Sequence, residues 1–246
     1  MSVRAVRAIL FDVGDTLVRL GPMERDLAPR LAAVLDAAGV ACDGDSATEH
    51  CERMMVRLRG DILAGFEASR LEEHDIPAML AAGLEAGGVT VASGVAADLA
   101  DVLSRADIAR IQPWPGVREE LERFRADGYR LAAVSNTTSR SRLLQDFFDA
   151  RGLTPCFDAW VFSVDLGVRK PHPAIYEHAL ATLDIPANEA LFVGDRVRED
   201  IVGPRSAGIA HAILTHEHRQ EDPGGSNPCA VITRFEDLHA ILPTLH

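Results

Sequence analysis

Acidic, hydroxyl and amide residues follow the short apolar runs of this chain. Asp12 comes directly after one run, Ser135 and Asn136 end a second, and Asp195 follows a third, with Asp200 five positions later. A carboxylate can attack phosphorus as a nucleophile, and carboxylate oxygens are ligands that Mg²⁺ prefers. A hydroxyl can bind phosphate oxygens. These residue types therefore indicate a metal-assisted phosphoryl-transfer site, provided that the fold brings them together.

The single lysine of the chain adds a cation to this set. Of the 25 basic residues, Lys170 is the only one that is not arginine. A compact ammonium on a flexible stem differs from a planar guanidinium, so a lone lysine marks a position that requires the ammonium. Codon bias with one surviving lysine is the plainer alternative. If the position is functional, Lys170 can bind phosphate oxygens and offset developing negative charge.

The apolar runs have the length and composition of buried parallel strands. Amphipathic helical patterns alternate with them, which predicts a parallel α/β sheet with right-handed crossovers. Ligands bind such sheets at the carboxyl ends of the strands, so the polar residues above should converge. The expected strands are Ala8–Phe11, Leu131–Val134, Trp160–Val164, Ala190–Val193, Ala212–Leu214 and Ala230–Ile232. The expected helices are Val117–Ala126, Ser139–Ala150, Ala174–Leu183 and Glu199–Ala207.

A segment without strands interrupts this alternation after the first strand. Residues 21–111 are rich in Ala, Leu, Arg and Glu, and the prolines and glycine of 113–116 mark a return linker. We predict a core domain of residues 1–20 and 112–246 and an inserted helical domain of residues 21–111. Its expected helices are Glu24–Ala38, Ala47–Gly60, Pro77–Ala86 and Val95–Ala109.

Four short stretches resemble the signatures of the haloacid dehalogenase (HAD)-like hydrolase superfamily, in the same order and spacing. They are Asp12-Val13-Gly14-Asp15-Thr16, Ser135-Asn136, Arg169-Lys170-Pro171-His172-Pro173 and Gly194-Asp195-Arg196-Val197-Arg198-Glu199-Asp200. The only lysine of the chain falls in the lysine signature. The resemblance covers the whole chain and implies a Rossmann-like parallel sheet core with an inserted helical C1 cap.

The resemblance also implies a nucleophile and a metal site. Asp12 would be the catalytic nucleophile, and Mg²⁺ would be the cofactor. The metal ligands would be Asp12, the backbone carbonyl of Gly14, Asp195 and Asp200. Asp200 has an alternative role as the cap of the following helix, where a carboxylate is favoured, and the two roles are compatible.

Phosphate binding is implied for a second group of residues: Thr16, Ser135, Asn136 and Lys170. Lys170 would also act in catalysis. Ser135 and Asn136 have a simpler alternative as turn residues after a strand. A cap or turn role is the simpler alternative for Asp12 and Asp195 as well, but their place within four matching signatures favours the functional interpretation.

One position departs from the phosphatase pattern that the chain resembles. Related phosphatases carry a second aspartate two residues after the nucleophile, as the general acid and base, and this chain has Gly14. Asp15 does not replace it directly, because side chains alternate along a strand. General acid–base catalysis contributes roughly 10²–10⁴-fold. Three outcomes fit: a substrate with a good leaving group, a proton supplied by a cap residue or water, or a weakened enzyme kept for binding.

Two other functions remain open. A nearly inactive HAD-like binding or regulatory protein would explain Gly14, although decay would also have removed Lys170 and Asp195. Haloacid dehalogenases of the superfamily lack the second aspartate as well and use no metal. They place Ser and Asn where this chain has acidic residues, so Asp195 and Asp200 favour a Mg²⁺-dependent phosphatase.

Composition limits the partners. The net charge of −12 argues against broad binding to nucleic acid or to anionic membranes. No apolar run of about 18 residues and no signal-peptide pattern occurs, so we expect a cytoplasmic protein. The abundance of Arg and Ala suggests a bacterial source with a GC-rich genome. The expected ligand is a small phosphorylated metabolite; its identity and the oligomeric state are not encoded in a readable way.

Overall fold

The computed structural model describes residues 6–22, 27–42 and 44–245, which form two compact units. We call them the core unit and the helical unit. The core unit contains the residues up to Gly21, Ile111–Thr137 and Gln145 onward, and the helical unit contains Pro22–Arg110 and Thr138–Leu144.

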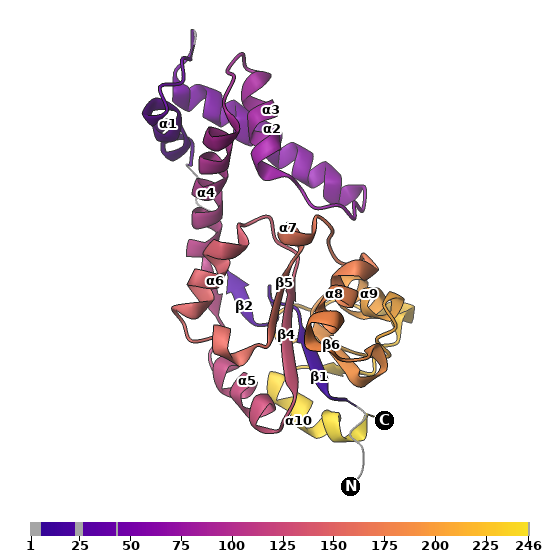
Figure 1. Ribbon diagram of the computed structural model, residues 1–246. Helices are drawn as coiled ribbons and strands as arrows, with labels where there is room; N and C mark the ends of the chain where they lie inside the picture. The colour runs from indigo at the N-terminus through magenta and orange to yellow at the C-terminus, as the bar shows by residue number, and fades with distance from the viewer. Residues whose placement is uncertain (1–5, 23–26, 43, 246) are drawn as a thin grey trace. The chain divides into compact units, whose positions relative to one another are not determined.

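A six-stranded parallel sheet forms the centre of the core unit, with strand order β5-β4-β1-β6-β7-β8. Figure 1 labels four of these strands, β1, β4, β5 and β6. Side chains on both faces of the central strands are buried, which explains why the strands read as continuous apolar runs. The strands are β1 Ala8–Phe11, β4 Arg130–Ser135, β5 Ala159–Phe162, β6 Ala190–Gly194, β7 His211–Thr215 and β8 Ala230–Ile232. The predicted α/β parallel fold is confirmed.

The predicted strand Trp160–Val164 is too long at its carboxyl end. β5 stops at Phe162, and Ser163–Leu166 form the short helix α7. The Ser163 hydroxyl accepts the Thr137 N–H at 2.8 Å, so this turn holds the backbone that follows β4.

Helices connect the strands of the core unit. In α5 the apolar residues Val117, Leu121 and Phe124 are buried, as the amphipathic pattern requires. The helices of this unit are α5 Val117–Ala126, α7, α8 Pro173–Leu183, α9 Gly203–Ser206 and α10 Leu238–Ile241. Helix α6 Ser141–Asp149 has its first four residues in the helical unit and the rest in the core unit. Short 3₁₀ turns cover Thr154–Cys156, Ala187–Glu189, Gly224–Ser226, Phe235–Asp237 and Leu242–Thr244.

The predicted helix Glu199–Ala207 is wrong in type. A π-helix runs over Val197–Val202, and only Gly203–Ser206 are α-helical. The Asp200 carboxylate accepts the Arg196 N–H at 3.0 Å, and the Tyr176 hydroxyl donates to the Glu199 carbonyl. These side-chain contacts hold the wide turn, and such π segments occur frequently at functional sites.

A two-stranded antiparallel ribbon was not predicted. β2 Val18–Leu20 pairs with β3 Ile111–Pro113, so the chain leaves and re-enters the core unit through paired strands. Each strand has only three residues, which is too short for an alternation pattern to be visible in the sequence. The predicted return linker at 113–116 overlaps the end of β3.

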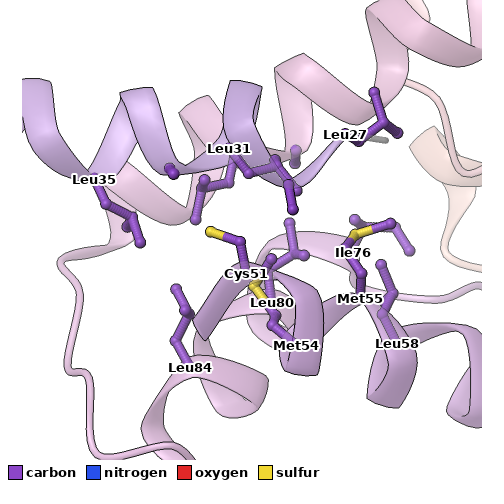
Figure 2. Close-up of a cluster of buried hydrophobic side chains, with 14 of the residues drawn as sticks. Leu27, Leu31, Leu35, Cys51, Met54, Met55, Leu58, Ile76, Leu80 and Leu84 are labelled. Carbon is purple, nitrogen blue, oxygen red and sulfur yellow. The ribbon is translucent and has the colours of Figure 1, made fainter. Parts of the chain in front are cut away.

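Four helices make up most of the helical unit: α1 Ala28–Ala37, α2 Ala47–Glu67, α3 Ile76–Glu85 and α4 Ser93–Ala109. Their apolar faces meet in one cluster around Leu31, Met54 and Leu80 (Figure 2). Helix α2 starts at a capping box, in which Ser46 and Glu49 satisfy each other's backbone N–H groups. The predicted helix Glu24–Ala38 begins at residues that lie outside the described ones, and α2 extends seven residues beyond the predicted end.

No helix in the described residues combines the length and the apolarity needed to cross a bilayer.

Candidate active site at the carboxyl ends of the strands

Three aspartates meet where the central strands end. Asp12 follows β1, Asp195 follows β6, and Asp200 lies in the π-helix after β6. One carboxylate oxygen from each lies within 4.8 Å of one from each of the others, and all three residues are buried. Adjacent parallel strands place their ends side by side, and the wide π turn brings Asp200 back to the same point.

The backbone at Gly194 makes room for Asp200. A Cβ atom at position 194 would lie 2.3 Å from the Asp200 Cγ, a distance that van der Waals contact forbids. Asp200 is fully buried, with one oxygen accepting the Arg196 N–H and the other accepting from Lys170. Glycine is therefore required at the end of β6 for the carboxylate to reach the cluster.

Lys170 joins two of these carboxylates. Its ammonium nitrogen lies 2.5 Å from Asp12 Oδ1 and 2.8 Å from Asp200 Oδ1, and the side chain is almost fully buried. Burial alone would disfavour the charged ammonium, but the carboxylates of Asp12 and Asp200 together hold the Lys170 pKa above its ordinary value. The lysine is therefore a fixed positive charge beside the proposed nucleophile.

Asn136 positions the backbone of Lys170. Its side-chain oxygen accepts the Lys170 N–H at 2.7 Å, and its side-chain nitrogen donates to the Lys170 carbonyl at 3.0 Å. Residues 136 and 170 come from different loops, so this paired contact ties the end of β4 to the lysine. The predicted contact of Asn136 with substrate stays a prediction; the observed bonds assign it a positioning role.

The two predicted phosphate-binding hydroxyls are both buried. Ser135 is the last residue of β4, and Thr16 lies in the turn after β1. Thr16 Oγ1 is inaccessible to solvent and has no hydrogen-bond partner in the described part of the chain. A buried hydroxyl without a partner is unfavourable unless a ligand or water satisfies it.

The turn between Asp12 and Thr16 is tight. Asp15 has a φ of +56°, and its N–H donates to the Val18 carbonyl at 2.7 Å. Gly14, two residues after Asp12, has open space where a side chain would begin. The Asp15 carboxylate accepts a hydrogen bond from Arg219 at 2.8 Å, so it is already committed to an ion pair.

Arg219 is a site residue that we did not predict. It belongs to the loop after β7, and its Nε lies 2.5 Å from Asp195 Oδ2. This is an ion pair without hydrogen-bond alignment, since neither Asp195 oxygen nor the Arg219 Nε has a hydrogen-bond partner among the described residues. Arginine is the ordinary basic residue of this chain, so nothing in the sequence distinguishes this one.

The electrostatics of the cluster fit a divalent cation. Burial, as the larger cause, and the negative charge of Asp12, as the smaller, raise the Asp195 pKa to about 7. Burial raises the Asp200 pKa as well, although the Lys170 ammonium acts in the opposite direction. Buried carboxylates that converge and lack enough donors are stabilised by a bound cation. The donors are all oxygens, which suits Mg²⁺.

Known proteins resemble the chain over most of its length. Residues 6–208 match the haloacid dehalogenase-like hydrolase family. A glyceraldehyde 3-phosphate phosphatase of Methanopyrus kandleri is 26% identical over 204 residues, which cover 83% of this chain and 82% of that protein. A phosphoglycolate phosphatase of Pseudomonas fluorescens is 28% identical over 247 residues, which cover 98% and 80% of the two.

Solved structures share the fold. A 2-haloacid dehalogenase from Pseudomonas syringae pv. Tomato superposes with a TM-score of 0.69 at 24% identity, covering 98% of this chain and all of that one. A HAD phosphatase from Thermococcus onnurineus gives 0.62 at 21% identity, covering 96% and 98%. The two differ in chemistry, so the fold alone does not select the reaction. The sheet, the converging aspartates and the match over residues 6–208 together establish that this chain belongs to the haloacid dehalogenase-like hydrolase family.

Proposed function

We propose that the chain is a Mg²⁺-dependent phosphatase that hydrolyses a small phosphorylated metabolite through an aspartyl-phosphate. The observation that carries this proposal is the cluster in which Lys170 contacts Asp12 while Asp12, Asp195 and Asp200 converge within 4.8 Å. Curated relatives that cover most of the chain bear the names of phosphatases that act on small metabolites.

Asp12 would act as the nucleophile. One of its carboxylate oxygens attacks phosphorus, the bond from phosphorus to the ester oxygen breaks, and the leaving oxygen takes up a proton. Water then attacks the phosphorus of the aspartyl-phosphate, which releases inorganic phosphate and regenerates Asp12. Lys170 orients the Asp12 carboxylate and offsets the negative charge that builds up on the phosphoryl oxygens. Thr16 and Ser135 would donate to those oxygens.

The residues that would hold Mg²⁺ are Asp12, Asp195, Asp200 and the backbone carbonyl of Gly14. A bound Mg²⁺ would neutralise phosphate charge and reduce repulsion between the phosphate and Asp12. Glycine offers the same backbone carbonyl as aspartate would, so the departure at position 14 does not remove a metal ligand.

Proton transfer is the step that this site performs least well. Gly14 has no side chain to protonate the leaving oxygen or to activate water, and Asp15 is paired with Arg219. The preferred substrates should therefore be phosphates whose leaving group is stable as an anion, or substrates that bring their own proton donor. Proton transfer through water is another route, at a cost of roughly 10²–10⁴-fold in rate.

The alternative of a haloacid dehalogenase has less support. Displacement of halide from carbon by a carboxylate requires no divalent cation, whereas the carboxylates of Asp12, Asp15, Asp195 and Asp200 exceed the two cations Lys170 and Arg219 and leave uncompensated negative charge. The structural similarity to a 2-haloacid dehalogenase lies below 25% identity and bears on the fold only.

A substrate panel tests the proposal. Sugar phosphates, nucleotides, acyl phosphates and 2-haloacids are assayed with and without Mg²⁺, for the unmodified protein and for Asp12→Asn. We expect Mg²⁺-dependent phosphate release that Asp12→Asn lowers by a factor on the order of 10⁵ or more, as for other covalent nucleophiles. Asp149→Asn, an exposed aspartate of α6, serves as the matched control and should retain activity.

Three results would contradict the proposal. Phosphate release that persists in Asp12→Asn would exclude this nucleophile. Halide release without metal would identify a dehalogenase. No turnover across the panel, with Mg²⁺ still bound, would favour the binding or regulatory protein that Gly14 also permits.

A further inference from the structure

The loop that carries Arg219 is held in place on several sides. The His216 N–H donates to the Ile232 carbonyl at 2.8 Å, and the Glu217 carboxylate accepts the Phe235 N–H at 2.6 Å. The ring of His218 stacks on Trp114, with ring centroids 3.4 Å apart and an interplanar angle of 18°. The backbone that carries Arg219 is therefore held in one position by contacts of the three residues before it.

Arg219 bridges two segments of the site. One terminal nitrogen donates to Asp15 in the turn after β1, and Nε lies beside Asp195 at the end of β6. The Asp15 hydrogen bond is the largest of several interactions with carboxylates that raise the Arg219 pKa further above its ordinary value. The Arg219 guanidinium thus keeps its positive charge, and it lies beside the Asp195 carboxylate, which is 2% exposed.

The charges of the site can be counted. Metal binding requires ionised ligands, so Asp12, Asp195 and Asp200 count as −3, and Asp15 makes −4. Lys170 and Arg219 contribute +2. The net of −2 matches one divalent cation, whereas a site without Arg219 would carry −3. Removing the guanidinium should therefore attract a divalent cation more strongly and a phosphate dianion less strongly.

We propose that Arg219 is a positioning residue that balances the charge of the phosphoryl site: it weakens Mg²⁺ binding at Asp195 and strengthens the binding of the phosphate dianion. The inference rests on the proposed function for its ligands. Since the Arg219 side chain is 38% exposed, solvent screens its charge, and the expected change for each ligand is about threefold to tenfold. If Arg219 had a purely structural role, its removal would instead weaken the binding of both Mg²⁺ and phosphate.

Calorimetry on the full chain separates these roles. Mg²⁺ is titrated into metal-free protein, and inorganic phosphate is titrated into Mg²⁺-saturated protein, for the unmodified chain, Arg219→Gln and Arg219→Lys. Arg118→Gln, which removes an exposed arginine of α5 paired with Glu122, is the matched control for net charge. Arg219→Gln should bind Mg²⁺ about threefold to tenfold more tightly and phosphate more weakly by a similar factor. Arg219→Lys and Arg118→Gln should stay within about twofold of the unmodified chain for both ligands.

Several outcomes would overturn the inference. They are weaker binding of both ligands by Arg219→Gln, unchanged binding of either ligand, and an Arg219→Lys variant that behaves like the glutamine variant. If the unmodified chain binds no Mg²⁺ at all, the metal dependence of the proposed function fails with it. If the unmodified chain binds Mg²⁺ and Arg219→Gln binds it equally well, only the role of Arg219 fails.

Discussion

The core unit and the helical unit use their side chains in different ways. In the core unit, apolar strands end in single polar residues, and the parallel sheet brings Asp12, Ser135 and Asp195 to one edge. In the helical unit, the buried residues form an apolar cluster from four helices. No group of three metal-ligating side chains gathers in its described residues. The residues of the candidate site are thus positioned by sheet topology.

A cavity of about 100 Å³ lies within the helical unit. Its walls are mostly apolar, with Arg59, Asp107 and a few hydroxyls among them. Burial raises the Asp107 pKa, so its carboxyl is less acidic than an exposed one. Helical periodicity encodes which face of each helix is buried, but it does not encode which buried residues border a cavity. The comparison therefore teaches that polar residues at strand ends can be read from a sequence more easily than residues that border a cavity between helices.

The largest expected change in stability comes from a substitution in the helical unit, and it should leave metal binding in the core unit unchanged. Leu80 is fully buried in the cluster of Figure 2. Leu80→Ala removes buried methyl groups and leaves a cavity, which should lower the free energy of unfolding by about 2–5 kcal/mol. Mg²⁺ affinity below the unfolding transition should not change. Denaturant unfolding followed by circular dichroism, together with Mg²⁺ titration, measures both.

Leu63→Ala is the matched control, since Leu63 lies on α2 with 58% of its surface exposed. It should change stability by less than about 0.5 kcal/mol. Loss of Mg²⁺ affinity in Leu80→Ala under folding conditions would show that the helical cluster supports the metal ligands, and the contrast between the units would fail.

The second effect concerns backbone shape in the core unit. Gly194→Ala places a methyl group against the Asp200 carboxylate, where the ideal Cβ would lie 2.3 Å from Cγ. The Asp200 carboxylate is fully buried and hydrogen-bonded to Lys170 and to the Arg196 N–H, which leaves it little room to move away. We expect a loss of about 1–3 kcal/mol in stability and clearly weaker Mg²⁺ binding, measured by thermal unfolding and calorimetry.

Gly14→Ala provides the comparison at a second glycine of the same site, because nothing lies within 4 Å of its ideal Cβ. It should retain both stability and Mg²⁺ binding. If Gly194→Ala also binds Mg²⁺ normally, Asp200 does not need its observed position, and its role as a metal ligand would be in doubt.

These two glycines show what a sequence can and cannot reveal. The strands of the sheet were predictable because their apolar runs are buried on both faces, and the ends of those runs located Asp12, Ser135 and Asp195. The requirement for glycine at position 194 depends on where Asp200 lies in three dimensions. The π-helix that places Asp200 is held by side-chain contacts from Lys170 and Tyr176, which no local pattern contains.

Arg219 and the paired strands β2 and β3 were missed for related reasons. Arg219 comes from a loop with no signature, and its partners are more than 20 positions away in sequence. The ribbon consists of two three-residue strands separated by the whole inserted segment. Long-range pairing of short strands, or of residues of a common type, leaves no pattern in the sequence. Lys170 could be noticed because it is the only lysine of the chain.

The smallest effect addresses the missing proton donor. Gly14→Asp introduces a carboxyl two residues after Asp12, and nothing lies within 4 Å of the Cβ that the new side chain would add. The backbone carbonyl remains, so metal binding should persist. If proton transfer limits the rate, turnover of alkyl phosphates, whose leaving groups are poor, should rise by about tenfold. This is less than the 10²–10⁴-fold of an optimised acid, since the surrounding residues are not arranged for it.

Leaving-group dependence makes this prediction specific. Acyl phosphates and aryl phosphates release stable anions and need little protonation, so Gly14→Asp should leave their turnover almost unchanged. Gly14→Asn has nearly the same shape but cannot transfer a proton, and it should not accelerate alkyl phosphates. An equal gain in the asparagine variant would mean that side-chain volume, and not acid–base chemistry, limits the reaction. An unchanged or lower rate in a folded Gly14→Asp variant would show that the proton already reaches the leaving oxygen by another route.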